Sequence, residues 1–244
     1  MFLLGIDLET NADPVDEYIT EIGAILYDWD TKQPVKFFSE MYRPSSCKPL
    51  SSDVVELTGI TNEMIRQFGY TLLDEDDDAE CGGNYGKFLD LSRMFYCAHY
   101  IVAHNGTKFD RPRLENFAKT YFMDLHDKPW IDTLTDVEYP KHCVAKNMTY
   151  LCGYHGFVNP FPHRAVFDVA AMMKVLANYD IERVIEVSKS PTIVIKASVS
   201  YDDRQLAKDA GFYWDGKRKF WLKKIKKIHL EGSSFIFPWK EVIL

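Results

Sequence analysis

Three apolar, strand-like segments follow one another within the first 42 residues, and they constrain the fold more than any other feature of the chain. Phe2–Ile6 is apolar and ends at Asp7, as expected of a buried strand with a polar residue at its exit. Glu21–Asp28 (EIGAILYD) and Pro34–Tyr42 (PVKFFSEMY) have the composition of the next two strands. The three segments therefore predict a β-meander.

Helical patterns dominate the next part of the chain. Short helices are predicted over Ser51–Leu57 and Thr61–Phe68, because each begins with a Ser or Thr that can cap it. The acidic run 74–80 (DEDDDAE) predicts a solvated loop. The remaining segments are a strand over 100–103 and helices over 85–98, 113–122, 148–154 and 165–179. Strands that come first and then alternate with helices predict a mixed α/β fold with helices packed on a sheet.

Length and composition set the class of protein. A chain of 244 residues with 46% hydrophobic residues can form one large domain, or a domain with a small appendage. The opening MFLLGIDLET has no basic region and the chain has no long apolar segment, so we expect a cytoplasmic protein without a signal peptide or membrane span. The cysteines are scattered and include no C-x-x-C pair, which indicates reduced thiols rather than a disulfide scaffold or a thiolate zinc site. They are Cys47, Cys81, Cys97, Cys143 and Cys152.

The charge is divided unequally along the chain. The whole chain has a net charge of −7, but from Val187 onward 12 Lys/Arg and 6 Asp/Glu give +6, whereas the remainder has 17 basic and 30 acidic residues and carries −13. A boundary is predicted near Ser188–Pro191, before the strand-like TIVIKASV. We therefore predict a domain over 1–187 and a small basic α+β module over 190–244, which could meet a polyanion.

The first candidate motif is the D-x-E of Asp7 and Glu9. At the period of a strand both carboxylates point to the same face. Clustered negative charge at the end of a buried strand costs free energy unless a positive charge neutralises it. The motif therefore indicates a cation site, although one D-x-E alone is weak evidence.

Two further motifs supply possible partners. In AHNGTKFD (103–110), Asp110 follows a short strand and precedes Pro112, which suits the first turn of a helix. Asp110 therefore lies at a strand–turn–helix junction near a sheet edge, or else simply caps that helix. In HRAVFD (163–168), His163 precedes the strongest helical pattern and Asp168 lies about one turn inside it.

Together the motifs contribute four carboxylates and one histidine. Oxygen-rich sites select hard divalent cations such as Mg²⁺ or Mn²⁺ rather than zinc. Two such ions about 3.5–4 Å apart can catalyse an in-line phosphoryl displacement by lowering the pKa of a water and stabilising the leaving oxygen. His163 could then accept the proton of that water as a general base.

The order and spacing of these motifs over residues 1–179 resemble the DEDDh exonucleases, which are relatives of the proofreading epsilon subunit of bacterial DNA polymerase III and of the TREX-type enzymes. LTGIT (57–61) is similar to a family segment that usually reads H-G-I-T, with Thr58 in place of the histidine. Asn11 also departs from the small residue found in many members. The sister group with a tyrosine in the third motif is disfavoured, because Arg164 stands four residues before Asp168.

The resemblance implies an RNase H-like fold, in which helices flank a mixed sheet whose first three strands are antiparallel. It implies 3′→5′ removal of nucleoside 5′-monophosphates with two Mg²⁺ (or Mn²⁺). Asp7 would bridge both metals, Glu9 and Asp168 would complete the first site, Asp110 would support the second, and His163 would be the base. The main chain from Leu8 to Thr10 would contact the 3′-hydroxyl, and Asn105 would help to orient the nucleotide.

The C-terminal segment offers a second candidate surface. Residues 203–210 predict a helix, and the D-G pair Asp215–Gly216 predicts a hairpin. Basic residues, among them Lys217, Arg218 and Lys219, interleave with Phe220 and Trp221, a pattern that can bind phosphates and stack on bases. Alternatively, the aromatic residues including Trp214 form the core of a mini-domain that the lysines solvate. The stretch is similar to a small module of phage and plasmid replication proteins, which suggests a viral or mobile-element origin.

Three functions remain open from the sequence. The favoured one is a 3′→5′ exonuclease on single-stranded or frayed DNA ends, with a polymerase or replication complex as a suggested partner. An RNA exonuclease of the RNase T or oligoribonuclease kind is the second, since the distinction depends on contacts to the 2′-hydroxyl. The third is a nucleic-acid-binding adaptor that has lost catalysis.

Overall fold

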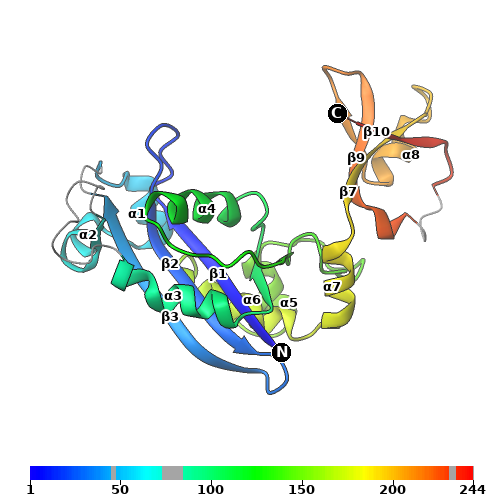
Figure 1. Cartoon of the computed structure of the whole chain (residues 1–244). Helices are drawn as coiled ribbons and strands as arrows, with labels where there is room; N and C mark the ends of the chain where they lie inside the picture. The colour runs from blue at the N-terminus through cyan, green and yellow to red at the C-terminus, as the bar shows by residue number, and fades with distance from the viewer. Residues whose placement is uncertain (45–47, 73–84, 231–234, 244) are drawn as a thin grey trace. The chain divides into compact units, whose positions relative to one another are not determined.

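The computed structural model describes residues 1–44, 48–72, 85–230 and 235–243 (Figure 1). The chain divides into two compact units, residues 1–184 and 185–244. The predicted acidic loop 74–80 lies outside the described residues, as do Cys47 and Cys81. No helix among the described residues is long and apolar enough to span a membrane. The three described cysteines are free thiols: Cys97, Cys143 and Cys152.

A six-stranded mixed sheet with the order β4-β3-β2-β1-β5-β6 forms the centre of the first unit. Figure 1 labels three of its strands, β1, β2 and β3. Its three long strands are antiparallel neighbours, which confirms the predicted meander: β1 (Phe2–Thr10), β2 (Ile19–Asp28) and β3 (Gln33–Pro44). The outer strands run parallel to their neighbours: β4 (Tyr70–Leu72), β5 (Tyr100–Ala103) and β6 (Trp130–Asp132). The predicted mixed α/β, RNase H-like fold is confirmed.

Helices cover both faces of this sheet. Leu4, Ile6 and Leu8 of β1 share one apolar cluster with residues of α3 (Tyr85–Cys97) and α4 (Asp110–Thr120). On the opposite face β1 packs against α6 (Ala165–Leu176), where a Cβ on Gly5 would lie 2.6 Å from Val169 Cγ1. Glycine at position 5 therefore allows α6 to approach the strand closely.

Smaller helices complete the first unit. Ser51 and Thr61 cap α1 (Ser52–Thr58) and α2 (Asn62–Phe68) through their side chains, as their sequence positions predict. The remaining helices are α5 (Met148–Tyr154), which lies within the first unit, and α7 (Ile181–Lys189), within which the first unit ends at Val184. α7 is not among the predicted helices, although its apolar spacing indicates one.

The boundaries of α4 and α6 differ from the prediction. α4 begins at Asp110, three residues before the predicted start at Arg113. Pro112 fits within the first turn because N–H groups there have no partner inside the helix, so its missing N–H costs no helical hydrogen bond. The helix ends at Thr120, and Phe122 has a positive φ of 54° that helical backbone cannot adopt. α6 ends at Leu176, three residues before the predicted end.

The second unit contains a four-stranded antiparallel sheet in the order β10-β7-β9-β8. Its strands are β7 (Thr192–Ala197), β8 (Tyr213–Asp215), β9 (Phe220–Lys226) and β10 (Trp239–Val242), with α8 (Arg204–Asp209) and a 3₁₀ turn over Lys227–His229. The predicted hairpin forms, but its loop spans the four residues 216–219 rather than a two-residue D-G turn. The Asp215 carboxylate accepts from the N–H groups of Lys217 and Arg218, and Lys219 takes the positive φ.

Candidate active site

Four of the five predicted catalytic side chains line one cavity of about 300 Å³ in the first unit: Asp7, Glu9, His163 and Asp168. Glu9, His163 and Asp168 each offer a donor atom, and these three atoms lie within 4.8 Å of one another. Residues separated by more than 150 positions in the sequence thus meet at one opening, with a donor set suited to a divalent cation.

The close approach of β2 to α6 brings the two halves of this cavity together. A Cβ on Gly23 of β2 would lie 2.2 Å from the backbone nitrogen of Val166 in the first turn of α6. Only glycine leaves room for the helix backbone at this distance. The first turn of α6, which carries Asp168, therefore packs directly against the strand beside Asp7, since Gly23 pairs with Asp7 in the sheet register.

Asp110, the fifth predicted residue, is not among the residues that line the cavity and is only 1% exposed. Its Oδ1 accepts a 3.1 Å hydrogen bond from the backbone N–H of Leu8. β5 pairs with β1 only as far as Gly5, so the carboxylate supplies a partner where the neighbouring strand has ended. The alternative interpretation of Asp110 as a helix cap is wrong, because α4 has no side-chain cap.

A buried aspartate that the sequence analysis missed organises the loop before α4. Asp132 at the end of β6 accepts hydrogen bonds from the backbone N–H groups of Asn105 (2.9 Å), Thr107 (3.1 Å) and Leu134 (3.1 Å). Asn105 has a φ of 63°, a conformation that asparagine tolerates better than most residues. Asp132 therefore fixes the turn that connects β5 to Asp110.

A second missed carboxylate, Glu21 of β2, holds the start of α6. Arg164 donates to both of its carboxylate oxygens (3.2 and 2.9 Å), and the backbone N–H of Ala165 donates to one of them (3.0 Å). His163 precedes this clamp with a φ of 61°, which is uncommon for a residue with a side chain. The clamp thus fixes the backbone on which His163 is presented to the cavity, while Asn159 donates to Asp168 Oδ1 at 2.9 Å.

The carboxylates repel one another and lose solvation. Burial, followed by the charges of Asp110 and Glu9, raises the pKa of Asp7 well above its ordinary range. Burial and the charge of Asp168 raise the pKa of Glu9 to about 8, against a smaller lowering effect of Arg164. Burial raises the pKa of Asp110 to about 7 although the hydrogen bond from Leu8 lowers it. Such perturbed groups in a cavity indicate a functional site that favours added positive charge.

The predicted substrate-binding residues are distributed differently. Leu8 lines the cavity, whereas Thr10 lines a neighbouring pocket that also includes Glu17 and Arg113. Asn105 is held by Asp132 in the loop that follows β5, and its neighbour His104 lines the cavity. Lys217, Arg218 and Lys219 belong to the second unit.

The segment LTGIT contributes through Leu57 rather than Thr58. Thr58 is buried, donates its hydroxyl to Val54 O and accepts from the N–H of Ile60. Leu57 is 58% exposed and lines the cavity. The other apolar lining residues that the sequence analysis missed are Phe109, Met148, Val169 and Met172.

Solved structures share this architecture. The nuclease domain of 3′hExo, a DEDDh family member bound to rAMP, matches with a TM-score of 0.54 and 14% identity, over 72% of this chain and 90% of its own. The chain has the fold of the DEDDh exonucleases. Escherichia coli Exonuclease I with a dT13 oligonucleotide matches with a TM-score of 0.57 and 16% identity, over 81% of this chain and 48% of its own. The expected DEDDh resemblance is thus confirmed at the level of the fold.

Three further comparisons concern another solved structure, domain models and curated proteins. A 3′-exonuclease that recognises the histone mRNA stem-loop matches with a TM-score of 0.53 and 17% identity, over 72% of this chain and 80% of its own. Residues 193–241 match the model of a domain of unknown function, DUF8626. No curated protein matches the sequence.

Proposed function

We propose that this protein is a metal-dependent 3′→5′ exonuclease that releases nucleoside 5′-monophosphates from single-stranded or frayed DNA ends. The observation that carries the proposal is the convergence of Asp7, Glu9, His163 and Asp168 on one cavity, backed by Asp110. The DEDDh fold over most of the chain supports the same reaction class.

The donor set fits two Mg²⁺ or Mn²⁺ ions. Four carboxylates with raised pKa values share the site, and the guanidinium of Arg164 is already engaged by Glu21. Hard oxygen ligands favour these cations. Glu9, Asp168 and the shared ligand Asp7 would hold the first ion, and Asp7, with support from Asp110, the second. Bound cations supply a water of lowered pKa and stabilise the leaving oxygen.

The chain's own groups perform the remaining tasks. His163 is exposed and lines the cavity, where its imidazole can accept the proton of an attacking water. Asn159 orients Asp168, and the Arg164–Glu21 clamp orients the segment before it. The main chain from Leu8 to Thr10 contacts the terminal 3′-hydroxyl, and Asn105 orients the nucleotide.

DNA is the proposed substrate and RNA is the alternative. One assay that compares cleavage of the two distinguishes them. Relatives of both kinds exist, since Exonuclease I was solved with dT13 and 3′hExo with rAMP. Pure protein is incubated with 5′- and 3′-labelled single-stranded DNA and matching RNA, in Mg²⁺, Mn²⁺ or EDTA. Stepwise shortening of DNA from the 3′ end that EDTA stops supports the proposal. Binding without cleavage of any strand would indicate the adaptor function instead.

Matched variants test the ligands in the same assay. Glu9→Gln removes one carboxylate charge from the cavity, and we expect activity to fall by more than the roughly 10- to 100-fold typical of residues that only support metal ligands. Glu56→Gln makes the same change on the exposed face of α1 and serves as the control. Equal activity of the two variants would contradict the metal assignment.

A further inference from the structure

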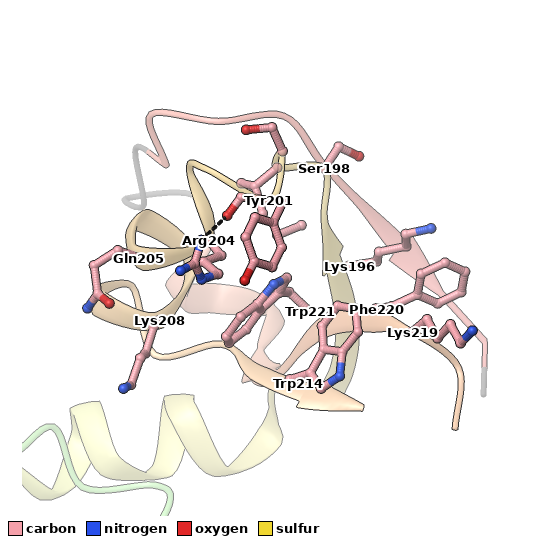
Figure 2. Close-up of a pocket in the computed structure, with 13 residues that line it drawn as sticks. Lys196, Ser198, Tyr201, Arg204, Gln205, Lys208, Trp214, Lys219, Phe220 and Trp221 are labelled. Atoms are coloured by element: carbon pink, nitrogen blue, oxygen red, sulfur yellow. Dashed lines mark hydrogen bonds between the residues drawn. The ribbon is translucent and has the colours of Figure 1, made fainter. Parts of the chain in front are cut away.

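The second unit contains a larger cavity than the carboxylate site, about 800 Å³, and its lining residues all lie within residues 196–221. Figure 2 shows the rings of Tyr201, Trp214, Trp221 and Phe220 along this cleft, with Arg204 and Lys208 on the helix side and Lys196 and Lys219 on the strand side. Four aromatic and four cationic side chains thus border one cleft.

The charge of the cleft has a single sign. Lys196, Arg204, Lys208 and Lys219 line it, and no aspartate or glutamate is among its lining residues. Two of the cations lie on aromatic rings, since Lys196 Nζ is 3.1 Å from the centroid of Phe220 and the Arg204 guanidinium carbon is 4.0 Å from that of Tyr201. The cleft is therefore complementary to a negatively charged ligand with flat, polarisable groups.

Most of these aromatic residues do not build the core of the module. The buried cluster there consists of Ile195, Ala197, Ala207, Phe212 and Phe237, and Trp221 packs partly against it. Trp214 is 51% exposed and Tyr201 is 78% exposed, although large apolar side chains are usually needed for the core of so small a unit. The alternative prediction, that these aromatic residues form the core of the module, therefore holds in part for Trp221. It fails for Trp214 and Phe220, neither of which belongs to that cluster.

The basic residues of β9 and of the hairpin loop before it differ in how far they are engaged by other groups. Lys223 Nζ donates to the carbonyl of Ala210 at 2.7 Å, and Lys226 Nζ donates to that of Ser188 at 3.3 Å. These bonds to backbone carbonyls already occupy donors of the two ammonium groups, which makes them weaker candidates for phosphate ligands than the cleft cations. Among the three predicted basic residues of the hairpin, Lys219 lines the cleft, whereas Arg218 pairs with Asp215 at 2.9 Å.

We propose that this cleft binds a segment of single-stranded nucleic acid, with bases stacked on Trp214 and Tyr201 and phosphates bound by Lys208, Lys219 and the guanidinium of Arg204, one nitrogen of which also donates to the Tyr201 carbonyl at 2.6 Å. The proposal concerns a binding site separate from the carboxylate cavity and does not require catalysis. Every base has a face that can stack, so the site tolerates any sequence. A duplex fits poorly, because its bases are already stacked on one another and present only edges and phosphates.

The test measures binding of the full-length protein to a fluorescent dT20 oligonucleotide. Fluorescence anisotropy reports the binding, in EDTA and at a fixed salt concentration. Trp214→Ala is expected to weaken binding about tenfold, since one stacked base is lost, whereas Trp214→Phe keeps a ring and most of the affinity. Trp239→Ala is the matched control, because Trp239 is 39% exposed on β10 of the same unit but does not line the cleft. A 20-base-pair duplex and rU20 are measured in parallel.

Three results would overturn the proposal: wild-type affinity in Trp214→Ala, an equal loss in Trp239→Ala, or duplex binding as tight as dT20 binding. Similar affinity for rU20 and dT20 would support stacking on bases, because stacking does not distinguish ribose from deoxyribose. Failure here is distinguishable from failure of the proposed exonuclease. Cleavage of labelled strands in Mg²⁺ tests the carboxylate site, whereas dT20 binding in EDTA tests this cleft without any cleavage, so the two proposals fail on different measurements.

Discussion

The backbone N–H of Leu8 donates to Oδ1 of Asp110, 102 residues away in the chain, at 3.1 Å. This bond joins the exit of β1 to the first residue of α4 and gives Asp110 two separable properties. Its oxygen satisfies a buried donor, and its charge contributes to the proposed metal site.

Substitutions at Asp110 separate the two properties. Asp110→Asn keeps an acceptor oxygen for Leu8 but removes the charge, so we expect loss of activity with unchanged or higher stability of the metal-free protein. Asp110→Ala leaves the Leu8 N–H buried without a partner and is expected to lower the free energy of unfolding by about 1–3 kcal/mol. Urea unfolding in EDTA and the labelled-strand assay measure both effects. Full activity of Asp110→Asn would exclude the carboxylate from the reaction.

The second prediction concerns the stability that the buried Glu21–Arg164 ion pair contributes. Arg164→Met leaves the buried carboxylate of Glu21, which is 1% exposed, without its counter-charge, so we expect a loss of roughly 3 kcal/mol in the free energy of unfolding. The double variant Glu21→Gln/Arg164→Met should recover much of that loss. Arg183→Met is the control, because it breaks a similar pair with Glu138 whose side chains are 37% and 42% exposed, and it should cost about 1 kcal/mol or less. Equal losses in the two single variants would refute the buried clamp.

The carboxylate cavity predicts how stability depends on pH. The pKa of Glu9 rises from 4.5 to about 8 on folding, so the folded protein retains a proton that the unfolded chain releases between these values. The free energy of unfolding of the metal-free protein should therefore fall as pH rises within this window. Burial lowers the pKa of His104, which adds the opposite slope below about pH 6.5, and the clean range is pH 6.5 to 8.

Thermal unfolding in EDTA and in Mn²⁺ at pH 6.5, 7.2 and 8 measures this effect. The midpoint in EDTA should decrease with pH, and the stabilisation by Mn²⁺ should increase, because the cation binds the deprotonated carboxylates. Glu9→Gln should flatten the EDTA series. A midpoint that rises with pH in EDTA would show that the cavity does not carry the proposed protons.

The sequence predicted the parts of the site that depend on local spacing. Asp7 and Glu9 share a face because strands have a period of two, and His163 and Asp168 flank a helix start that the pattern itself marks. Glu21 and Asp132 were missed because their partners, Arg164 and Asn105, lie 143 and 27 residues away and no local motif connects them. Short strands such as β4, β6 and β10 were missed because three or four residues carry little periodicity, whereas the equally short β5 was predicted from its apolar segment just before HNGTKFD.

The D-G pair in the C-terminal hairpin shows the limit of turn signals. Asp215 uses its side chain to accept from two backbone N–H groups, which favours a longer loop over the expected two-residue turn. The exposure of the Trp214 ring likewise could not be predicted. It depends on which residues fill the core, and the composition of the segment does not reveal this.

Glycine 23 allows a prediction about the geometry of the site. A Cβ there would meet the backbone of Ala165 and Val166 at 2.2–2.3 Å, so Gly23→Ala must displace the start of α6. We expect a loss of about 1–3 kcal/mol in stability and a fall in activity, because His163 and Asp168 move with the helix. Gly153→Ala in α5, where a Cβ meets nothing within 4 Å, should be neutral or slightly stabilising. Native stability of Gly23→Ala would contradict the close contact.

Salt dependence tests whether the cleft lysines contact phosphates. Lys208 and Lys219 are exposed lining residues, and each phosphate contact on a single strand adds about 0.7 to the slope of log K against log salt concentration. Lys208→Ala and Lys219→Ala should each reduce the slope for dT20 by about that amount and weaken binding most at low salt. Lys224→Ala, an exposed lysine on β9 outside the cleft, should leave the slope unchanged. If all three variants reduce the slope equally, the lysines act through general surface charge, and the cleft does not select the strand.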